Sequence, residues 1–470
     1  MIRWVRSRRT FAVVVLVVAL AAVVASPIAG LGRADVCADA GARYVQVGQC
    51  ADLSAVVADA VPPPEYIPLP REYRKLPPPG NIRHPVTNAQ WSTTDSNGPL
   101  PQGLWNAGTV QYEVGNYISD GRQIYGLICY PVSPGPHPVL IINHGVLFQG
   151  ALGLDTASFN GCTQMAAAGW FVATSTYRGW AMFGTGSPGV STFPPDPTFT
   201  RQSQGQFEFC GGEVDDSLNL LAAVKQLPQA NENQVVMWGH SHGSCITELA
   251  VERGAAPQVA VSLDGPTDFT TITWQQLNAP APFGYGAAWC ESCGPSDTDQ
   301  LTARSSAWSG NTPTNLATAK FLRIQAEGDG LVVPEFGCEL AAALGPGSSN
   351  YFLYPETSPP GTYVAPPKEC APWQPNPCYL DKTGSHCGAW KLGQLLPDTG
   401  KGGSWTSPTF LMYACPSSVC TGPDRSPIGN EGAAEHGAIM NQSWPEVANF
   451  VNHFTSGWNA SFPLQFVPIY

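Results

Sequence analysis

One short stretch carries the residue types of nucleophilic catalysis. VVMWGHSHGS, residues 235–244, places Ser241 between two histidines, which themselves stand between two glycines. A strand-like apolar run precedes this Gly-x-Ser-x-Gly pattern, and the helix-compatible run ITELA follows it. That order is typical of a nucleophile elbow, a turn so sharp that bulky side chains at the glycine positions would collide with neighbouring chain. The sequence therefore predicts that Ser241 is a nucleophile whose Oγ projects above a sheet.

The histidines beside the serine, His240 and His242, are poor candidates for the base that activates it. Side chains adjacent to a nucleophile on such a turn splay away from it, so neither ring easily brings a nitrogen within ~3 Å of Oγ. We expect both rings to pack on either side of the turn and the His242 backbone N–H to donate to an oxyanion. A second oxyanion donor is expected at the Val146 N–H, in the loop after the strand that ends INHG.

The acid and the base must come from later in the chain, because in this fold the serine is followed by an acid and then by a histidine. After the strand-like run FLRIQA, Asp329 stands in the loop EGDGLVVPE, with Glu327 as the alternative acid. Two histidines follow: His436 in EHGAIM, before a closing helix, and His386 within a Cys-rich segment. We expect Asp329 to fix the tautomer of His436, and His436 to accept the Ser241 proton.

The elements that would position these residues alternate between strand and helix. Helical patterns cover 213–227 and 444–454, and apolar runs predict strands at 109–114, 123–130, 137–145, 169–179, 235–238, 258–265 and 321–326. This alternation predicts an α/β class with a mostly parallel sheet and helices on both faces. Two segments rich in Pro, Gly, Trp and Cys, 270–312 and 342–430, are too long for simple connections. We expect them to be Cys-rich loop insertions near the substrate.

The first 105 residues divide into a targeting segment and an accessory arm. Residues 1–34 combine a basic start, an apolar run from Phe11 to Ala25 and small residues, which is typical of a removed export signal. Its Ser-Arg-Arg-Thr-Phe order resembles a twin-arginine signal, with an ordinary secretory signal as the alternative. Residues 35–105 include VPPPEYIPLPREYRKLPPPG, where proline excludes regular helix and central strand. The catalytic domain is expected over 106–470.

Cysteine usage and charge restrict the compartment and the partners. All 14 cysteines follow residue 34, and an even number in a secreted chain predicts disulfides; the lone Cys290–Cys293 pair favours a disulfide over zinc. The net charge is −12, and removal of five arginines with residues 1–34 gives −12 − 5 = −17. This charge argues against nucleic acid or an anionic membrane surface as a partner. No stable membrane insertion is expected after signal removal.

Several segments together resemble a known family: INHG, STYRG, FCGGEVDD, WGHSHG, the ARS at 303–305, and GDGLVVP. They resemble the prolyl-oligopeptidase and dienelactone-hydrolase branch of the α/β-hydrolases, over roughly residues 109–341 and 431–456. The resemblance implies an eight-stranded α/β-hydrolase core, a triad of Ser241, Asp329 and His436, and neither metal nor organic cofactor. Two features depart from it. The segment before the core is too short for the β-propeller of family peptidases, and the Asp-to-Pro spacing in DGLVVP is one residue longer than the commonest pattern.

These residues predict a secreted serine hydrolase that cleaves a small or polymeric carboxylic ester through an acyl-serine intermediate. Trp373 and Trp390 in the second insertion could shape its cleft. The alternative is an oligopeptidase or exopeptidase, which needs an acid to hold a peptide amine; Glu291 and Asp297 are candidates. A non-catalytic surface or binding protein on a hydrolase scaffold is a third hypothesis, disfavoured because no triad residue is missing.

Overall fold

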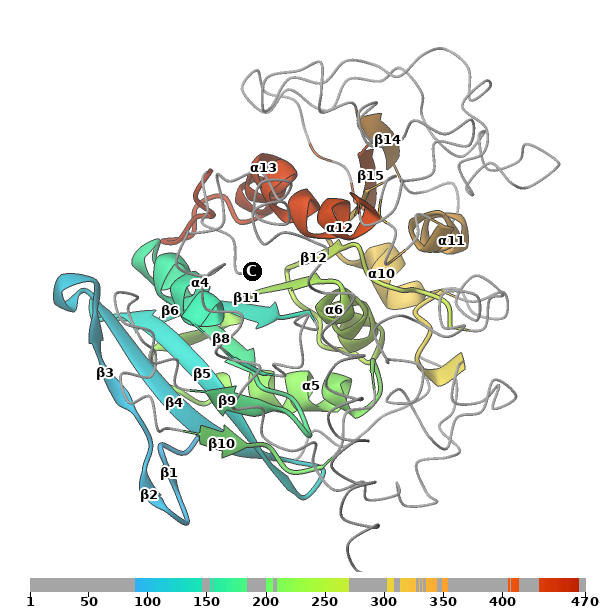
Figure 1. The fold of residues 1–470 in the computed structure, drawn as a ribbon. Helices are drawn as coiled ribbons and strands as arrows, with labels where there is room; N and C mark the ends of the chain where they lie inside the picture. The colour runs from blue at the N-terminus through green and yellow to red at the C-terminus, as the bar shows by residue number, and fades with distance from the viewer. Residues whose placement is uncertain are drawn as a thin grey trace, which may run out of the picture. The chain divides into compact units, whose positions relative to one another are not determined.

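A ten-stranded mixed sheet organises the computed structural model of the chain (Figure 1). In sheet order its strands are β14 (Ser349–Leu353), β15 (Thr409–Tyr413), β13 (Phe321–Ala326), β12 (Val259–Leu263), β11 (Ala230–His240), β6 (His137–Asn143), β8 (Phe171–Ser175), β5 (Arg122–Pro131), β4 (Val110–Ser119) and β3 (Gln102–Trp105). The seven strands from β14 to β8 run parallel, and β5, β4 and β3 extend the sheet antiparallel.

The structure describes the chain in segments, all within one compact unit, Asp59–Tyr470. They are residues 89–145, 153–154, 156–183, 200–205, 209–269, 302–307, 313–326, 329, 332, 335–344, 349–353, 405, 407–413 and 431–464. The predicted signal, most of the predicted arm and most of both predicted insertions lie outside these residues. Short elements complete the description: the hairpin β1 (Thr94–Asp95) and β2 (Gly98–Pro99), the turn η2 (Asn106–Gly108), and a small sheet of β10 (Thr200–Gln202), β9 (Ala181–Phe183) and β7 (Gly153–Leu154).

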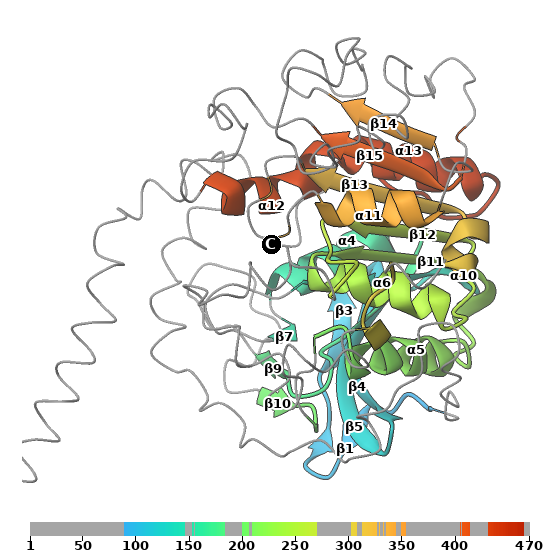
Figure 2. The same cartoon turned by 90° about the vertical axis from the view of Figure 1, so that its right-hand side faces the viewer.

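Helices cover both faces of the sheet (Figure 2). One layer consists of α4 (Thr156–Ala167), α12 (Glu431–Gln442) and α13 (Trp444–Phe454). The opposite layer consists of α5 (Gly212–Val224), α6 (His242–Glu252), α10 (Thr314–Thr318) and α11 (Glu335–Leu344). The predicted α/β class, a mostly parallel sheet with helices on both faces, is confirmed.

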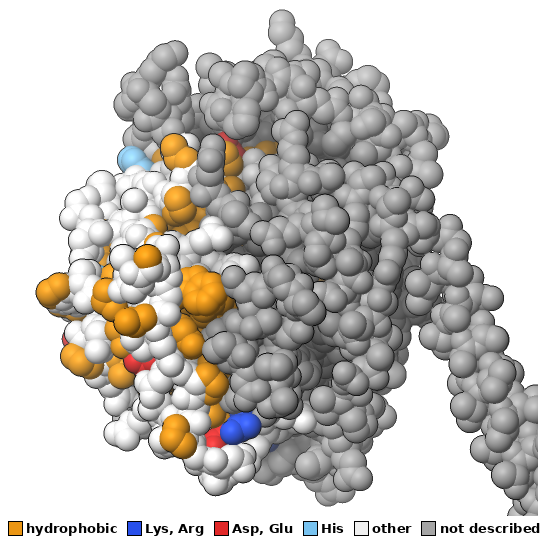
Figure 3. Space-filling view, turned by 60° about the vertical axis from the view of Figure 1, so that its left-hand side comes forward, with side chains coloured by type: hydrophobic (Ala, Val, Ile, Leu, Met, Phe, Trp, Pro, Cys, Tyr) orange, Lys and Arg blue, Asp and Glu red, His pale blue; other side chains and the backbone are white. Residues whose placement is uncertain are grey.

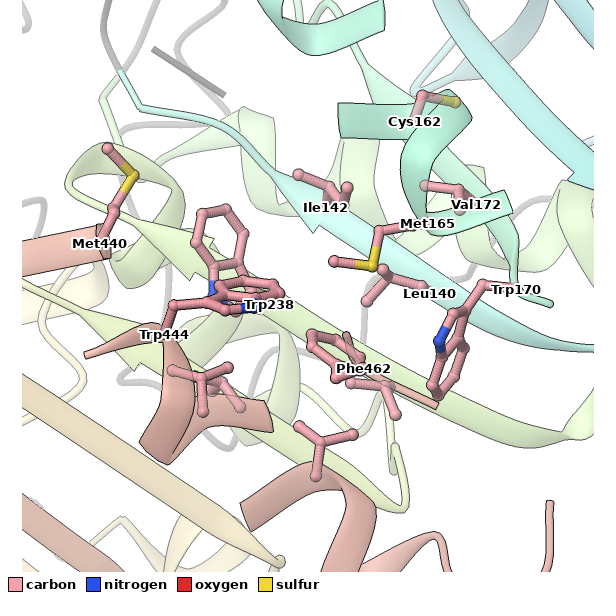
Figure 4. Close-up of a cluster of buried hydrophobic side chains, with 14 of the residues drawn as sticks. Leu140, Ile142, Cys162, Met165, Trp170, Val172, Trp238, Met440, Trp444 and Phe462 are labelled. Atoms are coloured by element: carbon pink, nitrogen blue, oxygen red, sulfur yellow. The ribbon is translucent and has the colours of Figure 1, made fainter. Parts of the chain in front are cut away.

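Alternate residues of the central strands pack into two separate hydrophobic cores, one on each face of the sheet. On β6, Leu140 and Ile142 belong to the cluster under α4, α12 and α13, which Figure 4 shows. Val139 and Ile141, on the same strand, belong to the cluster under α5 and α6. Successive side chains on a strand point to opposite faces, so a parallel strand between two helix layers needs an unbroken apolar run. This is why HPVLIIN is apolar throughout instead of alternating.

Two predicted boundaries are corrected by the strand pairing. β3 lies in the segment predicted to be an accessory arm, but it pairs with β4, so the main sheet begins at Gln102 instead of residue 106. β14 and β15 lie inside the predicted insertion 342–430, yet both are parallel strands of the sheet. The implied eight-stranded core is therefore extended to ten strands. Four- and five-residue strands among Pro, Gly and Cys give too weak a periodic signal to be recognised from sequence.

Two disulfides confirm part of the cysteine prediction. Cys129 on β5 is bonded to Cys162 on α4, with a Cα–Cα distance of 5.7 Å. Cys210, two residues before α5, is bonded to Cys245 on α6. Each bridge ties a helix to a neighbouring part of the fold.

Among the described helices, none combines the length and the apolar composition that a bilayer crossing requires. On the side of the β3 edge, the surface shows scattered hydrophobic side chains and few charged ones (Figure 3). The large hydrophobic side chains with the greatest exposure in the described residues, Leu104 and Leu464, are 60% and 59% exposed. Single exposed apolar side chains of this kind are normal on protein surfaces.

Removing the Cys129–Cys162 bridge should lower the thermal stability. The two cysteines are 33 residues apart. Without the bridge the unfolded chain gains conformational entropy, and this should lower the free energy of unfolding by about 3–4 kcal/mol. We expect the Cys129→Ala/Cys162→Ala variant to melt roughly 5 °C or more below the wild type, measured by circular dichroism. Thiol titration of the denatured, unreduced wild type provides the control. A free thiol at either position, or an unchanged melting temperature, would contradict the bridge's role.

Candidate active site

Ser241 occupies the turn between β11 and α6 in a strained backbone conformation. Its φ and ψ are 57° and −124°, a region that side chains other than glycine rarely adopt. The Ser241 N–H donates to the carbonyl oxygen of Leu263 on β12 at 2.8 Å, which anchors the turn to the neighbouring strand. Ser241 is partly exposed, whereas both flanking residues are buried. The turn thus presents one hydroxyl at the carboxyl edge of the parallel sheet.

Steric contact explains the two glycines of the Gly-x-Ser-x-Gly pattern. A Cβ on Gly239 would collide with the backbone carbonyl of Gly243, because α6 starts directly over the end of β11. A Cβ on Gly243 would collide with the carbonyl of Asn143 at the end of β6. The predicted reason for these glycines therefore agrees with the packing: neither position has room for a side chain.

Asp329 and His436 meet at the same edge of the sheet, although 107 residues separate them in sequence. Asp329 follows β13, and its Oδ2 lies 2.6 Å from Nδ1 of His436 on α12. The second carboxylate oxygen of Asp329 accepts the backbone N–H of Val332 at 2.9 Å. Both side chains are buried. Because the carboxylate binds a proton on Nδ1, the Nε2 of His436 carries the lone pair and can act as a base.

The alternatives weighed from sequence fall outside the described residues. Glu327, the other candidate acid, His386, the other candidate base, and Val146, the expected second oxyanion donor, have no described placement. His242 is the first residue of α6, so its N–H lies at the end of the helix where the macrodipole favours negative charge. This position suits the oxyanion role predicted for His242.

The rings of both flanking histidines contact other parts of the chain. Nε2 of His240 donates to the backbone carbonyl of His436 at 2.9 Å, and the two rings lie 4.7 Å apart between centroids. Nε2 of His242 accepts the Cys210 N–H at 3.2 Å, and its ring stacks on Phe209. Burial lowers the pKa of both imidazoles well below the usual range. Both rings are therefore packed as neutral groups.

Sequence reasoning missed Asp264, which lies beside the acid and the base. It follows β12 directly, and a carboxylate oxygen lies within 4.8 Å of ring nitrogens of both His240 and His436. Burial, and then the neighbouring carboxyl of Asp329, raise the pKa of Asp264 well above its usual range. The signal was present in SLDG: an aspartate directly after a parallel strand arrives at the same edge as one after the next strand. Only the sheet order showed that β12 and β13 are neighbours.

The buried guanidinium of Arg323 holds the start of α6, next to the Ser241 turn. Arg323 on β13 forms an ion pair with Glu248 on α6 at 2.7 Å and donates to Ser244 Oγ at 2.9 Å. It also donates to the carbonyl oxygen of Gly265 and to Gln325 Oε1, both at 2.6 Å. One cation thereby links α6, the loop after β12 and the strand that leads to Asp329.

The Arg323 network reaches the loop of Asp329 through one further residue. Gln325 Nε2 donates to the carbonyl oxygen of Val332 at 2.9 Å, and the N–H of Val332 binds Asp329. Burial raises the pKa of Glu248, and the Arg323 charge opposes that rise. The ionised pair is therefore held in place by complementary charge and by hydrogen bonds, not by solvent.

A second buried cation explains the STYRG and FCGGEVDD segments. Arg178, after β8, forms ion pairs with Asp216 on α5 at 2.8 Å and with Asp120 at 2.9 Å. The backbone N–H of Arg178 also donates to Asp216 at 2.8 Å. A Cβ on Gly212 would collide with this guanidinium, so the glycine allows the start of α5 to approach it. These residues are thus structural partners across the sheet edge.

Two groups of side chains in the described residues bring three possible metal ligands together. The first, Cys210, His242 and Cys245, has both sulfurs tied in a disulfide, so neither is a thiolate ligand. The second is His240, Asp264 and His436, in which His436 Nδ1 already binds Asp329. Neither donor set fits a bound metal as it stands.

A family model matches part of the chain. The model described as the prolyl oligopeptidase family matches residues 201–355, a segment that contains Ser241 and Asp329. No curated protein matched the sequence.

Solved structures of similar proteins include peptidases and an esterase. An acylaminoacyl peptidase from Pyrococcus horikoshii is 14% identical, with 50% of this chain and 35% of that chain covered and a TM-score of 0.35. Acetyl xylan esterase 1 from Thermoanaerobacterium sp. JW/SL YS485 is 15% identical over 59% of this chain and 89% of that one, with a TM-score of 0.40. Prolyl oligopeptidase B from Galerina marginata is 17% identical over 51% and 32%, with a TM-score of 0.36. Identities this low carry no information on substrate.

Breaking the buried ion pair below the turn should destabilise the fold. Arg323→Met leaves the carboxylate of Glu248 without its cation, at an expected cost of about 3–5 kcal/mol. The Glu248→Gln/Arg323→Met double variant removes the uncompensated charge and should regain part of that loss. Thermal melting of the three proteins measures both effects. A single variant as stable as the wild type, or a double variant less stable than Arg323→Met, would contradict this account of the pair.

Proposed function

We propose that this chain, whose α/β-hydrolase fold and family-model match support a serine hydrolase, cleaves carboxylic esters through an acyl-enzyme on Ser241. The observation that carries the proposal is the arrangement at the sheet edge. A strained turn presents the Ser241 hydroxyl, and a separate imidazole, His436, is held by the buried carboxylate of Asp329 at 2.6 Å. A serine, a base and an acid that orients the base are the three parts required for acyl transfer.

In the proposed reaction, His436 Nε2 accepts the proton of Ser241 as Oγ attacks the carbonyl carbon of the ester. The tetrahedral oxyanion is stabilised by the backbone N–H groups of His242 and Val146. His436 then donates the proton to the alcohol as the C–O bond breaks, which leaves the acyl-serine. Water attacks this intermediate by the same steps and releases the carboxylic acid. Asp329 stays ionised throughout and stabilises the imidazolium.

The site of action is proposed to be outside the cytoplasm. The predicted export signal over residues 1–34 supports this compartment, and so do the Cys129–Cys162 and Cys210–Cys245 bridges, since disulfides persist mainly in oxidising environments.

A second candidate is a peptidase that uses the same residues. The match of residues 201–355 to the prolyl oligopeptidase family favours it. Fold and triad alone do not choose between an ester and an amide. Glu291 and Asp297, the candidate ligands for a peptide amine, and Trp373 and Trp390, the candidate cleft aromatics, lie outside the described residues.

Replacing the serine should abolish covalent modification. We expect Ser241→Ala to lose all labelling by a fluorophosphonate probe, because the probe forms its bond with an activated serine Oγ. Ser133→Ala, at an exposed serine in the turn between β5 and β6, should label like the wild type and serves as the control. Gel fluorescence and mass spectrometry of the labelled peptide report the site. Full labelling of Ser241→Ala would refute the nucleophile assignment.

The two candidate bases should respond differently to alanine. His436→Ala should reduce kcat for an ester by about three orders of magnitude or more, as removal of a triad base does. His386→Ala should retain activity. Steady-state kinetics of both variants, with circular dichroism to verify folding, provides the test. The opposite result would transfer the role of base to His386.

Parallel assays should separate the two substrate classes. We expect the purified, oxidised protein to hydrolyse p-nitrophenyl butyrate and to leave Ala and Pro p-nitroanilides uncut, because an ester is the easier bond to break. Both reactions release a coloured product and are followed by absorbance, with Ser241→Ala as the blank. Efficient anilide cleavage would replace the esterase proposal by the peptidase.

A further inference from the structure

Two carboxyl groups, not one, accompany the imidazole of His436. Asp329 binds its Nδ1 at 2.6 Å, and an oxygen of Asp264 lies within 4.8 Å of a ring nitrogen of the same histidine. Asp264 takes no part in the reaction as proposed above. Asp264 is fully buried, so its protonation state affects the charge beside the proposed catalytic pair.

The backbone holds Asp264 in this position. Its φ is +44°, a left-handed conformation that aspartate and asparagine adopt more often than most residues other than glycine. The Asp264 N–H donates to Ile324 at 2.9 Å, and its Oδ1 accepts the Ala326 N–H at 2.8 Å, so both ends of the residue are fixed to β13. The next residue, Gly265, is held by Arg323 at 2.6 Å. The carboxyl group is therefore constrained to the end of β13, where the loop of Asp329 begins.

The hydrogen bonds around Asp264 suit a neutral acid. As a carboxylate, its Oδ2 is a buried acceptor with no donor among the described residues. As an acid, the Asp264 side chain carries a donor, and the side chain of Asp329 lies beside it as a hydrogen-bond partner. A buried acceptor left without a donor is costly, whereas a carboxylic acid facing a carboxylate satisfies both groups.

The surrounding charges point the same way. The titratable and charged groups that face Asp264 are Asp329, His240, His436 and Arg323. His240 is a buried neutral ring, and the cation of Arg323 is already paired with Glu248 at 2.7 Å. Two carboxyls that share a buried site cannot both ionise easily, so one of them keeps its proton. Asp329, which binds the imidazole and the Val332 N–H, is the better stabilised anion.

We propose that Asp264 is a positioning residue that remains a neutral acid and donates its proton in a hydrogen bond to the Asp329 carboxylate. The acid and the carboxylate together carry one proton and one negative charge. The bond fixes the carboxylate that orients His436, and it leaves a single negative charge to face the imidazolium formed during the reaction. This inference rests on the proposed function, because it assigns Asp264 a role through the Asp329–His436 pair.

Two replacements of similar size separate donation from space filling. Asp264→Asn keeps a donor towards Asp329 and should retain kcat for p-nitrophenyl butyrate within a few-fold of the wild type. Asp264→Leu removes the donor and should lower kcat by about tenfold or more with little change in KM, because Asp264 is fully buried. Equal kcat values for the Asn and Leu variants would overturn the proposal, whether both stay near the wild-type value or both fall.

Infrared spectroscopy tests the proton itself, without any need for activity, and remains informative if the Leu variant fails to fold. The wild type minus Asp264→Asn difference spectrum at neutral pH should contain the band of a protonated carboxyl group. A carboxylate band in its place would overturn the proposal. Fluorophosphonate labelling of Ser241 in the same samples reports the proposed function separately. A protonated Asp264 in a protein whose Ser241 is not labelled would refute the hydrolase and leave the shared proton standing.

Discussion

The structure depends on the close crossing of α6 over the ends of β11 and β6. At this crossing Gly239 faces the carbonyl of Gly243, and Gly243 faces the carbonyl of Asn143, with no room for a Cβ at either glycine. The chain reverses here through the strained conformation of Ser241. The surrounding fold stabilises that strain, since β11 is paired on both sides by parallel strands and the Ser241 N–H is bonded to β12. The position of the hydroxyl is thus a consequence of sheet and helix packing.

Next to this crossing the fold buries an ion pair, Arg323 with Glu248, instead of apolar side chains. Arg323, Glu248 and their hydroxyl and amide partners connect α6 with the loops after β12 and β13. A buried ion pair contributes little net stability, but its directional bonds penalise any displacement of its parts. Because the same network reaches the loop of Asp329, the serine and the acid are positioned by one set of contacts. On the neighbouring side of the sheet edge, Arg178 and its two aspartates hold α5 in a similar way.

The proposed chemistry uses the carboxyl edge of the parallel strands. The ends of β11, β12 and β13 supply Ser241, Asp264 and Asp329, and α12 brings His436 to the same edge. Side chains that follow adjacent parallel strands converge there without any further folding of the chain. Asp264, Asp329 and His436 are thus neighbours at this edge, and all three are buried.

The sequence by itself determined the local parts of this protein. The strand–Gly-x-Ser-x-Gly–helix order required the sharp turn at Ser241, and the unbroken apolar run at 137–143 required a strand covered on both faces. Chain order also selected Asp329 and His436, which the fold brings within 2.6 Å. Tertiary structure decided the rest. Strand order made β12 the neighbour of β13, so an aspartate with no motif around it became a partner of the acid. Pairing to β4 and β13 made strands of β3 and β15, whose four and five residues carry too little periodicity to be recognised alone. Strand neighbours and side-chain partners of this kind are set by the three-dimensional packing, and the spacing of residues in the sequence does not predict them.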